Sequence, residues 1–177
     1  MSRFVVMGVS GAGKSLIGRH LSEAIGAVFF DGDDLHPAAN VAKMTAGTPL
    51  DDADRAPWLE RIGGCLRRPG TVIACSALRR RYREAITAAA GAPVTFLFLT
   101  GPREVLAARM AARTGHYMPA GLLDSQIATL EVPGPDERCV AADIVGTPEE
   151  IVAIFLAGLA RLGTGGASDS RGSSGRS

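Results

Sequence analysis

The stretch Gly8–Ser15, GVSGAGKS, decides the fold of this chain. It matches G-x-x-x-x-G-K-[ST], the pattern of a phosphate-binding loop (P-loop), which arises by chance in about one in a hundred chains of this length. The apolar run Arg3–Met7 before it predicts a buried strand, and Lys14–Ile25 after it carries apolar residues near helical spacing. Phosphate binding by this loop requires that order of strand, loop and helix.

Glycines in such a loop let backbone N–H groups turn inward around a phosphate, and the helix N-terminus adds a partial positive charge. We expect Lys14 to neutralise the β- and γ-phosphates of a nucleotide and the Ser15 hydroxyl to ligate Mg²⁺. The alternative is a glycine-rich turn with an exposed lysine. The expected phosphate-binding residues are Gly8, Val9, Ser10, Gly11, Ala12, Gly13, Lys14 and Ser15.

Strands and helices alternate along the rest of the chain. Apolar runs predict the strands, and the run Val94–Leu99 is apolar on both faces. This pattern indicates an α/β fold with a parallel sheet wrapped by helices. Further strands are expected at Ala27–Phe30, Thr71–Cys75 and Val94–Leu99, with a weaker strand at Cys139–Ile144. Further helices are expected from about Asp52, at Leu78–Ala90, at Pro102–Arg113 and at Pro148–Leu162. Gly63 and Gly64 weaken the end of the helix that begins near Asp52.

Length and composition favour one globular domain. The chain has 177 residues, 46% of them hydrophobic and 21% charged, and its formal net charge of +1 does not suggest a general nucleic-acid or membrane binder. Three widely spaced cysteines fit reduced thiols in the cytosol better than a disulfide framework. We expect a single domain over residues 1–162 of a cytoplasmic protein, followed by a disordered glycine- and serine-rich tail at 163–177.

Three carboxylates follow the second expected strand, in the stretch DGDDLHPAANVAKM at Asp31–Met44. Ligands gather beyond the carboxyl ends of the strands in an open parallel sheet, so we expect Asp31 and Asp33 to face the γ-phosphate. Their i, i+2 spacing on extended chain would point both side chains the same way, so that one can serve magnesium and the other can orient a nucleophilic hydroxyl. Asp34 is expected to point away. The alternative is a solvated turn around Gly32.

Arginines cluster at the start of the helix that follows the third expected strand. Cations at a helix N-terminus are unfavourable, and this violation is expected if an anion binds among them. Arg79 and Arg83 share one helical face at i, i+4, which makes them candidates for an anionic acceptor, and His36 adds a polar group near the aspartates. The alternatives are a solubilising basic face for the arginines and a structural role for His36.

A polar stretch interrupted by glycine and proline extends from about residue 114 to 137. It follows Arg109 and Arg113, which lie one helical turn apart. In small P-loop kinases a mobile segment in this place brings arginines onto the transferring phosphate, and a glycine hinge at Gly115 suits closure. We therefore expect a lid at about 114–137. Arginines near a helix C-terminus are favourable in any protein, which is the alternative.

Taken together, these motifs resemble the thermoresistant-type gluconate kinases, within the shikimate-kinase-like P-loop kinases. The P-loop defines only the superfamily, whereas the stretch at 31–59 and CSALRRRYR at 75–83 are far more specific. The resemblance also covers RTGHYMPAGLLDSQIATLE at 113–131 and PGPDER at 133–138. It implies a three-layer P-loop kinase fold with a five-stranded parallel sheet in the order 2-3-1-4-5, and often a homodimer.

The resemblance further implies that ATP, with Mg²⁺, phosphorylates D-gluconate at its 6-hydroxyl to give 6-phospho-D-gluconate and ADP. By similarity, Asp31 would support magnesium and Asp33 would hold the acceptor hydroxyl. Arg109 would stack near adenine, Arg113 would reach the γ-phosphate, and Pro148 would close the adenine pocket. The implied catalytic residues are Lys14, Asp33 and Arg113, and the candidate gluconate contacts are Asp33, His36, Arg79 and Arg83.

Two rival functions stay open at this point. A P-loop kinase for another small hydroxy acid, such as shikimate, would keep the chemistry and change the acceptor. Against shikimate, the third strand is followed by CSAL rather than by the glycine-rich run of shikimate kinases. A nucleotide-binding regulatory module without turnover would need only the P-loop, whereas the acidic pair and the lid arginines favour transfer.

Overall fold

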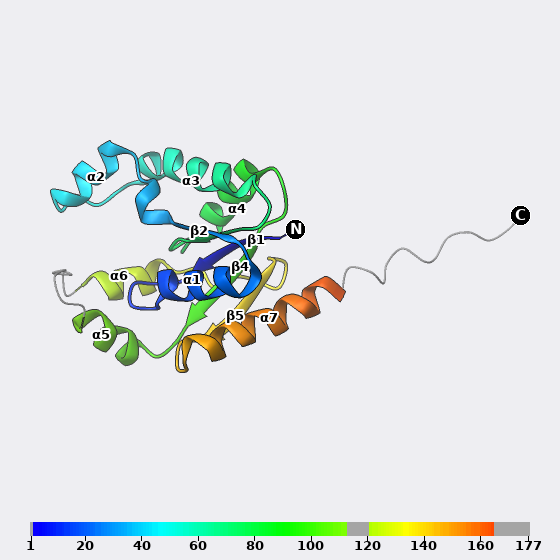
Figure 1. The fold of residues 1–177 in the computed structure, drawn as a ribbon. Helices are drawn as coiled ribbons and strands as arrows, with labels where there is room; N and C mark the ends of the chain where they lie inside the picture. The colour runs from blue at the N-terminus through cyan, green and yellow to red at the C-terminus, as the bar shows by residue number, and fades with distance from the viewer. Residues whose placement is uncertain (1, 113–120, 165–177) are drawn as a thin grey trace, which may run out of the picture.

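A five-stranded parallel sheet between two layers of helices forms the centre of the molecule (Figure 1). The computed structural model describes residues 2–112 and 121–164. The sheet order β2-β3-β1-β4-β5 confirms the expected fold, and every neighbouring pair of strands is parallel. The strands are β1 (Arg3–Met7), β2 (Val28–Asp31), β3 (Thr71–Ala74), β4 (Thr95–Thr100) and β5 (Cys139–Asp143).

Each face of the sheet has its own hydrophobic core, because side chains alternate along a strand. Phe4 and Val6 of β1 pack into the core under helices α1 (Lys14–Ile25) and α7 (Pro148–Thr164). Val5 and Met7 pack into the opposite core, under α3 (Asp52–Leu66) and α4 (Arg80–Ala90). Figure 1 shows these two helix pairs on opposite sides of the sheet. Burial on both faces explains why the central strands β1, β3 and β4 are mostly apolar, whereas the edge strands β2 and β5 are partly exposed.

Several local expectations were wrong. The chain does not stay extended after Asp31: a 3-10 helix, η1 (Gly32–Leu35), begins at once, because the Asp31 carboxylate accepts a hydrogen bond from the Asp33 N–H. By contrast, the helix expected from about Asp52 is confirmed as α3, which continues through Gly63 and Gly64 to Leu66. Two helices were not foreseen, α2 (Ala38–Thr45) and α6 (Leu122–Thr129), and α5 (Arg103–Ala111) is shorter than expected.

The end of the chain and part of the expected lid lie outside the described residues. Helix α7 continues to Thr164, two residues beyond its expected end, and the tail expected to be disordered is not described from residue 165 onward. Arg113 and Gly115 are also not described. No helix among residues 2–112 and 121–164 is long and apolar enough to cross a membrane.

Candidate active site

The P-loop lies between β1 and α1 and leaves the N-terminus of α1 open for an anion. Gly13 is the N-cap of α1 with φ of 88°, and the first turn contains no acidic residue. A side chain at Gly8 would also be impossible, because a Cβ there would lie 2.7 Å from the Leu99 carbonyl oxygen. Lys14 Nζ folds back over the loop and donates to the Val9 carbonyl at 3.2 Å. The partial positive charge of the α1 N-terminus and the charge of Lys14 would therefore both act on a phosphate bound in the loop.

The two residues expected to serve magnesium are in direct contact. Ser15 Oγ donates to Asp31 Oδ2 at 2.6 Å, linking the first turn of α1 to the last residue of β2. Among the described residues, no three or more His, Cys, Asp or Glu side chains gather as a metal cluster. Mg²⁺ does not need one, since in kinases it is bound by one or two carboxylates together with substrate phosphates and water. A hydroxyl beside one carboxylate fits this requirement.

Asp33 lies next to this pair, but it lies on a 3-10 turn that the sequence did not suggest. It is exposed in η1, and its N–H donates to Asp31 Oδ1 at 3.1 Å. The expectation that Asp31 and Asp33 point the same way assumed an extended chain between them. The structure has a 3-10 turn there instead, so their i, i+2 spacing no longer predicts a shared direction. Asp34 is exposed as well, and it lines a small hollow together with Arg19 and Asp31.

His36 packs on Trp58, which is itself hydrogen-bonded to the acidic turn. Its ring stacks on Trp58 with centroids 4.3 Å apart, and Trp58 Nε1 donates to the Gly32 carbonyl at 2.7 Å. His36 Nδ1 lies 3.3 Å from Asn40 Nδ2. Burial lowers the pKa of His36 below its usual value, although the neighbouring Asp33 carboxylate acts to raise it. A neutral imidazole held in this way can accept or donate one hydrogen bond to a hydroxylated ligand.

The arginines at the start of α4 have different partners from those expected. Arg83 is 1% exposed, and its guanidinium donates to both oxygens of Glu137 at 2.6 and 2.9 Å and to the carbonyls of Ala77 and Leu78. Arg80 forms an ion pair with Asp136 at 2.6 Å. The anions implied by this basic cluster are therefore, for Arg80 and Arg83, carboxylates of the chain itself.

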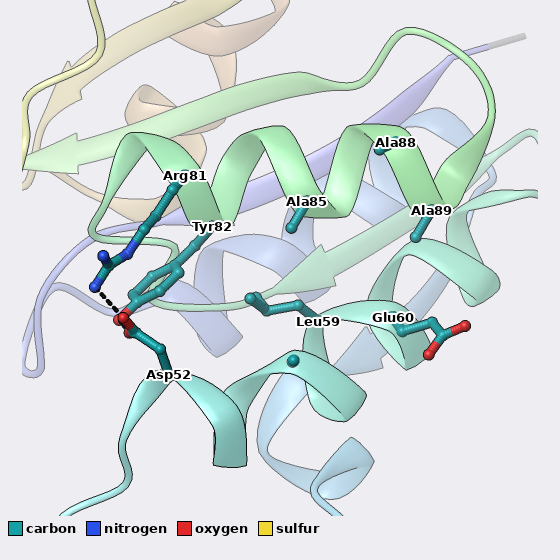
Figure 2. Close-up of a pocket in the computed structure, with 9 residues that line it drawn as sticks. Asp52, Leu59, Glu60, Arg81, Tyr82, Ala85, Ala88 and Ala89 are labelled. Atoms are coloured by element: carbon teal, nitrogen blue, oxygen red, sulfur yellow. Dashed lines mark hydrogen bonds and ion pairs between the residues drawn. The ribbon is translucent and has the colours of Figure 1, made fainter.

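Arg81 also has a partner within the chain. It lines a hollow of about 440 Å³ between α3 and α4 (Figure 2). It forms an ion pair with Asp52, which also accepts from Tyr82 Oη at 2.7 Å. Figure 2 shows Arg81 and Tyr82 turned toward Asp52 at one end of the hollow and alanines along the α4 side. Because no P-loop residue lines this hollow, we place it outside the phosphoryl-transfer site.

Arg79 is the exception in the cluster. It is the N-cap of α4 and is partly buried, and its Nε is enclosed without a hydrogen-bond partner among the described residues. A buried donor left unpaired is costly, and in native structures such a group calls for an explanation. An anionic ligand at this position would supply the missing acceptor. The geometry thus separates Arg79 from Arg83, which the sequence had grouped together.

A cavity of about 270 Å³ adjoins the P-loop on the side of α7. Arg109 and Pro148 both line it, so the structure brings the two residues expected near adenine to the same place as Gly11–Gly13. Arg109 Nη2 donates to the Ile144 carbonyl at 2.8 Å, which fixes the arginine against the end of β5. The cavity has apolar walls, including Leu16 and Ile151, which suits the flat face of a base.

The second half of the expected lid is anchored in this structure. The Glu131 N–H donates to the Leu78 carbonyl at 2.8 Å, and the Asp136 and Glu137 carboxylates bind arginines of α4. Sequence reasoning also missed one contact at the P-loop, where Gln126 Oε1 accepts from the Ser10 N–H at 2.6 Å. Nothing in the order of residues could show this contact, because 116 positions separate the two.

Comparison with known proteins adds independent evidence. Residues 4–133 match the family model described as AAA domain. The chain is 50% identical to a gluconokinase of Gluconobacter oxydans (strain 621H) over 141 residues, covering 77% of this chain and 79% of that protein. It is 47% identical to the thermosensitive gluconokinase of Escherichia coli (strain K12), covering 76% and 74%. The crystal structure of a gluconokinase from Sinorhizobium meliloti 1021 has a TM-score of 0.86 and 47% identity, covering 96% of this chain and 98% of that one.

Proposed function

Because this chain belongs to the gluconokinase family of P-loop kinases, we propose that it transfers the γ-phosphoryl group of ATP to the 6-hydroxyl of D-gluconate, giving 6-phospho-D-gluconate and ADP. The observation that carries the proposal is the contact between Ser15 and Asp31, which joins the nucleotide loop to the acidic turn. A P-loop alone argues only for nucleotide binding. A carboxylate beside the P-loop serine adds what transfer requires.

The P-loop side of the site binds and orients the nucleotide. Lys14 and the N-terminus of α1 stabilise the phosphate charge, and the cavity beside Arg109 and Pro148 takes the adenine. Mg²⁺ held by Ser15 and Asp31 would neutralise charge that develops on the β- and γ-phosphate oxygens. Catalysis of phosphoryl transfer is mostly positioning and electrostatic stabilisation, so these groups account for most of the chemistry required of the protein.

The acceptor lies, in this proposal, between the acidic turn and the N-terminus of α4. Asp33 orients the 6-hydroxyl toward the γ-phosphate, and a loose transition state needs little proton removal early in the reaction. His36 is placed to contact hydroxyls of the acceptor, since its ring is fixed by Trp58. Arg79 binds the carboxylate at the other end of the gluconate chain, because its Nε lacks a partner in the part of the chain that the structure describes and a guanidinium fork matches a carboxylate. Arg83 is not assigned a gluconate contact.

The test is an ADP-release assay on the purified chain with Mg²⁺ and ATP. We expect ADP release to depend on D-gluconate, to be at least 100-fold weaker with shikimate at equal concentration, and to be abolished in Lys14→Ala. Phosphorus–proton correlation in the product spectrum should place the phosphate on carbon 6. Release that is equal with every acceptor, or a product phosphorylated elsewhere, would contradict the proposal.

A further inference from the structure

Helix α6 is hydrogen-bonded to the P-loop through Gln126. Gln126 Oε1 accepts a hydrogen bond of 2.6 Å from the N–H of Ser10. Ser10 follows Val9, whose carbonyl accepts from Lys14 Nζ at 3.2 Å. The Val9 carbonyl and the Ser10 N–H belong to the same peptide group, so the glutamine and the catalytic lysine hold its two polar ends.

The same segment of chain is fixed on the acceptor side five residues later. The Glu131 N–H donates to the Leu78 carbonyl at 2.8 Å, and Glu131 Oε2 accepts from the Arg80 N–H at 2.7 Å at the start of α4. Leu130 packs against both hydrophobic cores. Residues 126–131 thus connect the P-loop with the backbone on either side of Arg79.

We propose that Gln126 is a positioning residue for phosphoryl transfer, an inference that rests on the proposed function of the site. Its amide oxygen holds the Ser10 peptide and so keeps the P-loop in register with the acceptor side of the cleft. An amide suits this position better than a carboxylate does. Both accept from an N–H, but only the amide does so without placing a negative charge beside the phosphates of the nucleotide.

Two substitutions of Gln126 separate the contact from its charge. Gln126→Leu removes the acceptor, and we expect kcat/KM for ATP to fall about 3- to 10-fold, as for the loss of one neutral hydrogen bond. Gln126→Glu keeps an acceptor but adds a charge. At pH 8 it should bind a non-hydrolysable ATP analogue with Mg²⁺ more weakly than Gln126→Leu does. Its affinity relative to Gln126→Leu should recover as the pH falls toward about 5 and the carboxylate gains protons.

A matched control lies on the same helix. Asp124 accepts from Arg103 Nε at 2.6 Å and anchors α6 to α5 without touching the P-loop, so Asp124→Asn loosens the helix and leaves the Ser10 contact intact. We expect its kcat/KM for ATP to stay within about twofold of wild type, as for loss of one exposed ion pair. If Asp124→Asn weakens kcat/KM as much as Gln126→Leu does, general anchoring of α6 is the cause and the proposal is wrong.

The pH arm is equally decisive, because a merely structural glutamine gives no reason for the affinity of Gln126→Glu to depend on pH relative to Gln126→Leu. A constant ratio of the two affinities between pH 5 and 8 would overturn the proposal. Binding of the ATP analogue is measured by calorimetry without an acceptor. Failure of gluconate phosphorylation in the wild-type chain would therefore reject the proposed function while this arm still reports on Gln126.

Discussion

At the scale of single residues, Asp31 has two roles, and each of its two carboxylate oxygens serves one of them. Oδ2 accepts from the Ser15 hydroxyl, and Oδ1 accepts from the Asp33 N–H to start the 3-10 turn. One carboxylate thus links the P-loop to the acidic turn and determines where Asp33 lies. Because Asp33 has no such structural contact through its own carboxylate among the described residues, the two aspartates should respond differently to the same substitution.

Asp31→Asn and Asp33→Asn test this difference. We expect Asp31→Asn to raise the Mg²⁺ concentration needed for half-maximal rate, because a neutral amide binds a hard cation less well than a carboxylate. Asp33→Asn should chiefly lower kcat, by about 100-fold or more if the carboxylate orients the acceptor hydroxyl. Magnesium titrations of kcat would show both effects. Identical titrations with equal losses of rate would contradict the division of roles.

Arg79 and Arg80 form a second pair of neighbours with different environments. Arg79 has a buried Nε without a partner among residues 2–112 and 121–164, whereas Arg80 is paired with Asp136 and Glu84. We expect Arg79→Met to raise KM for gluconate so that kcat/KM falls about 10- to 150-fold, the cost of one charge-assisted hydrogen bond. KM for ATP should change little. Arg80→Met is the control and should leave both constants within about threefold; a rise of KM for ATP in Arg79→Met would instead assign that arginine to the nucleotide.

At the scale of elements, helix α3 begins with a capping box and packs closely against α4. Asp51 Oδ1 accepts from the Asp54 N–H at 2.8 Å, and Asp54 Oδ2 accepts from the Asp51 N–H at 3.0 Å. Gly63 lies where α3 approaches α4, and a Cβ at that position would lie 2.7 Å from the Ile86 carbonyl oxygen and closer still to Ala89. The glycine is therefore a packing requirement rather than a weak point of the helix.

Gly63→Ala and Gly64→Ala are a matched pair for this argument. Gly63→Ala should lower the free energy of unfolding by about 1–3 kcal/mol, because the new methyl group forces α3 away from α4. A Cβ at Gly64 would meet nothing within 4 Å, so Gly64→Ala should raise stability by up to about 1 kcal/mol through helix propensity. Urea unfolding followed by circular dichroism measures both. Equal effects of the two substitutions would show that propensity alone, and not the contact with α4, decides the outcome.

At the scale of the whole molecule, the ion pair of Arg83 and Glu137 joins α4 to the residues just before β5. Arg83 is 1% and Glu137 11% exposed, and the guanidinium holds the pKa of Glu137 below its usual value. The carboxylate is thus more acidic in the folded chain than in the unfolded one. By linkage, its contribution to stability is present above the unfolded pKa of about 4.3 and is lost as the pH falls through the lower folded pKa.

Glu137→Gln should show this contribution directly. At pH 7 we expect the free energy of unfolding to fall by about 3–5 kcal/mol, because the substitution leaves the Arg83 charge buried without its counterion. Wild type should lose stability as the pH falls below about 4.5, and the difference between wild type and variant should shrink over that range. Urea titrations at pH 7, 4 and 3 test this. A difference that stays constant with pH would show that Glu137 contributes by packing and not by charge.

The sequence by itself determined the fold and the P-loop side of the site. The order of strand, glycine-rich loop and helix is local, and two-sided apolar strands require helices on both faces, so the parallel sheet follows from short stretches of chain. The carboxyl ends of parallel strands meet at one edge, which is why the sequence alone predicts that Ser15 and Asp31 lie together. Local pattern and strand direction carry this information.

Only the tertiary structure decided which polar side chains are available to a ligand. Arg79, Arg80, Arg81 and Arg83 look alike in sequence, and their difference comes from Glu137, Asp136 and Asp52, which lie far along the chain. The contact of Gln126 with Ser10 is of the same kind. Hydrogen bonds and ion pairs act over a few ångströms, and residues distant in the chain come within that range only after the cores on both faces of the sheet have packed.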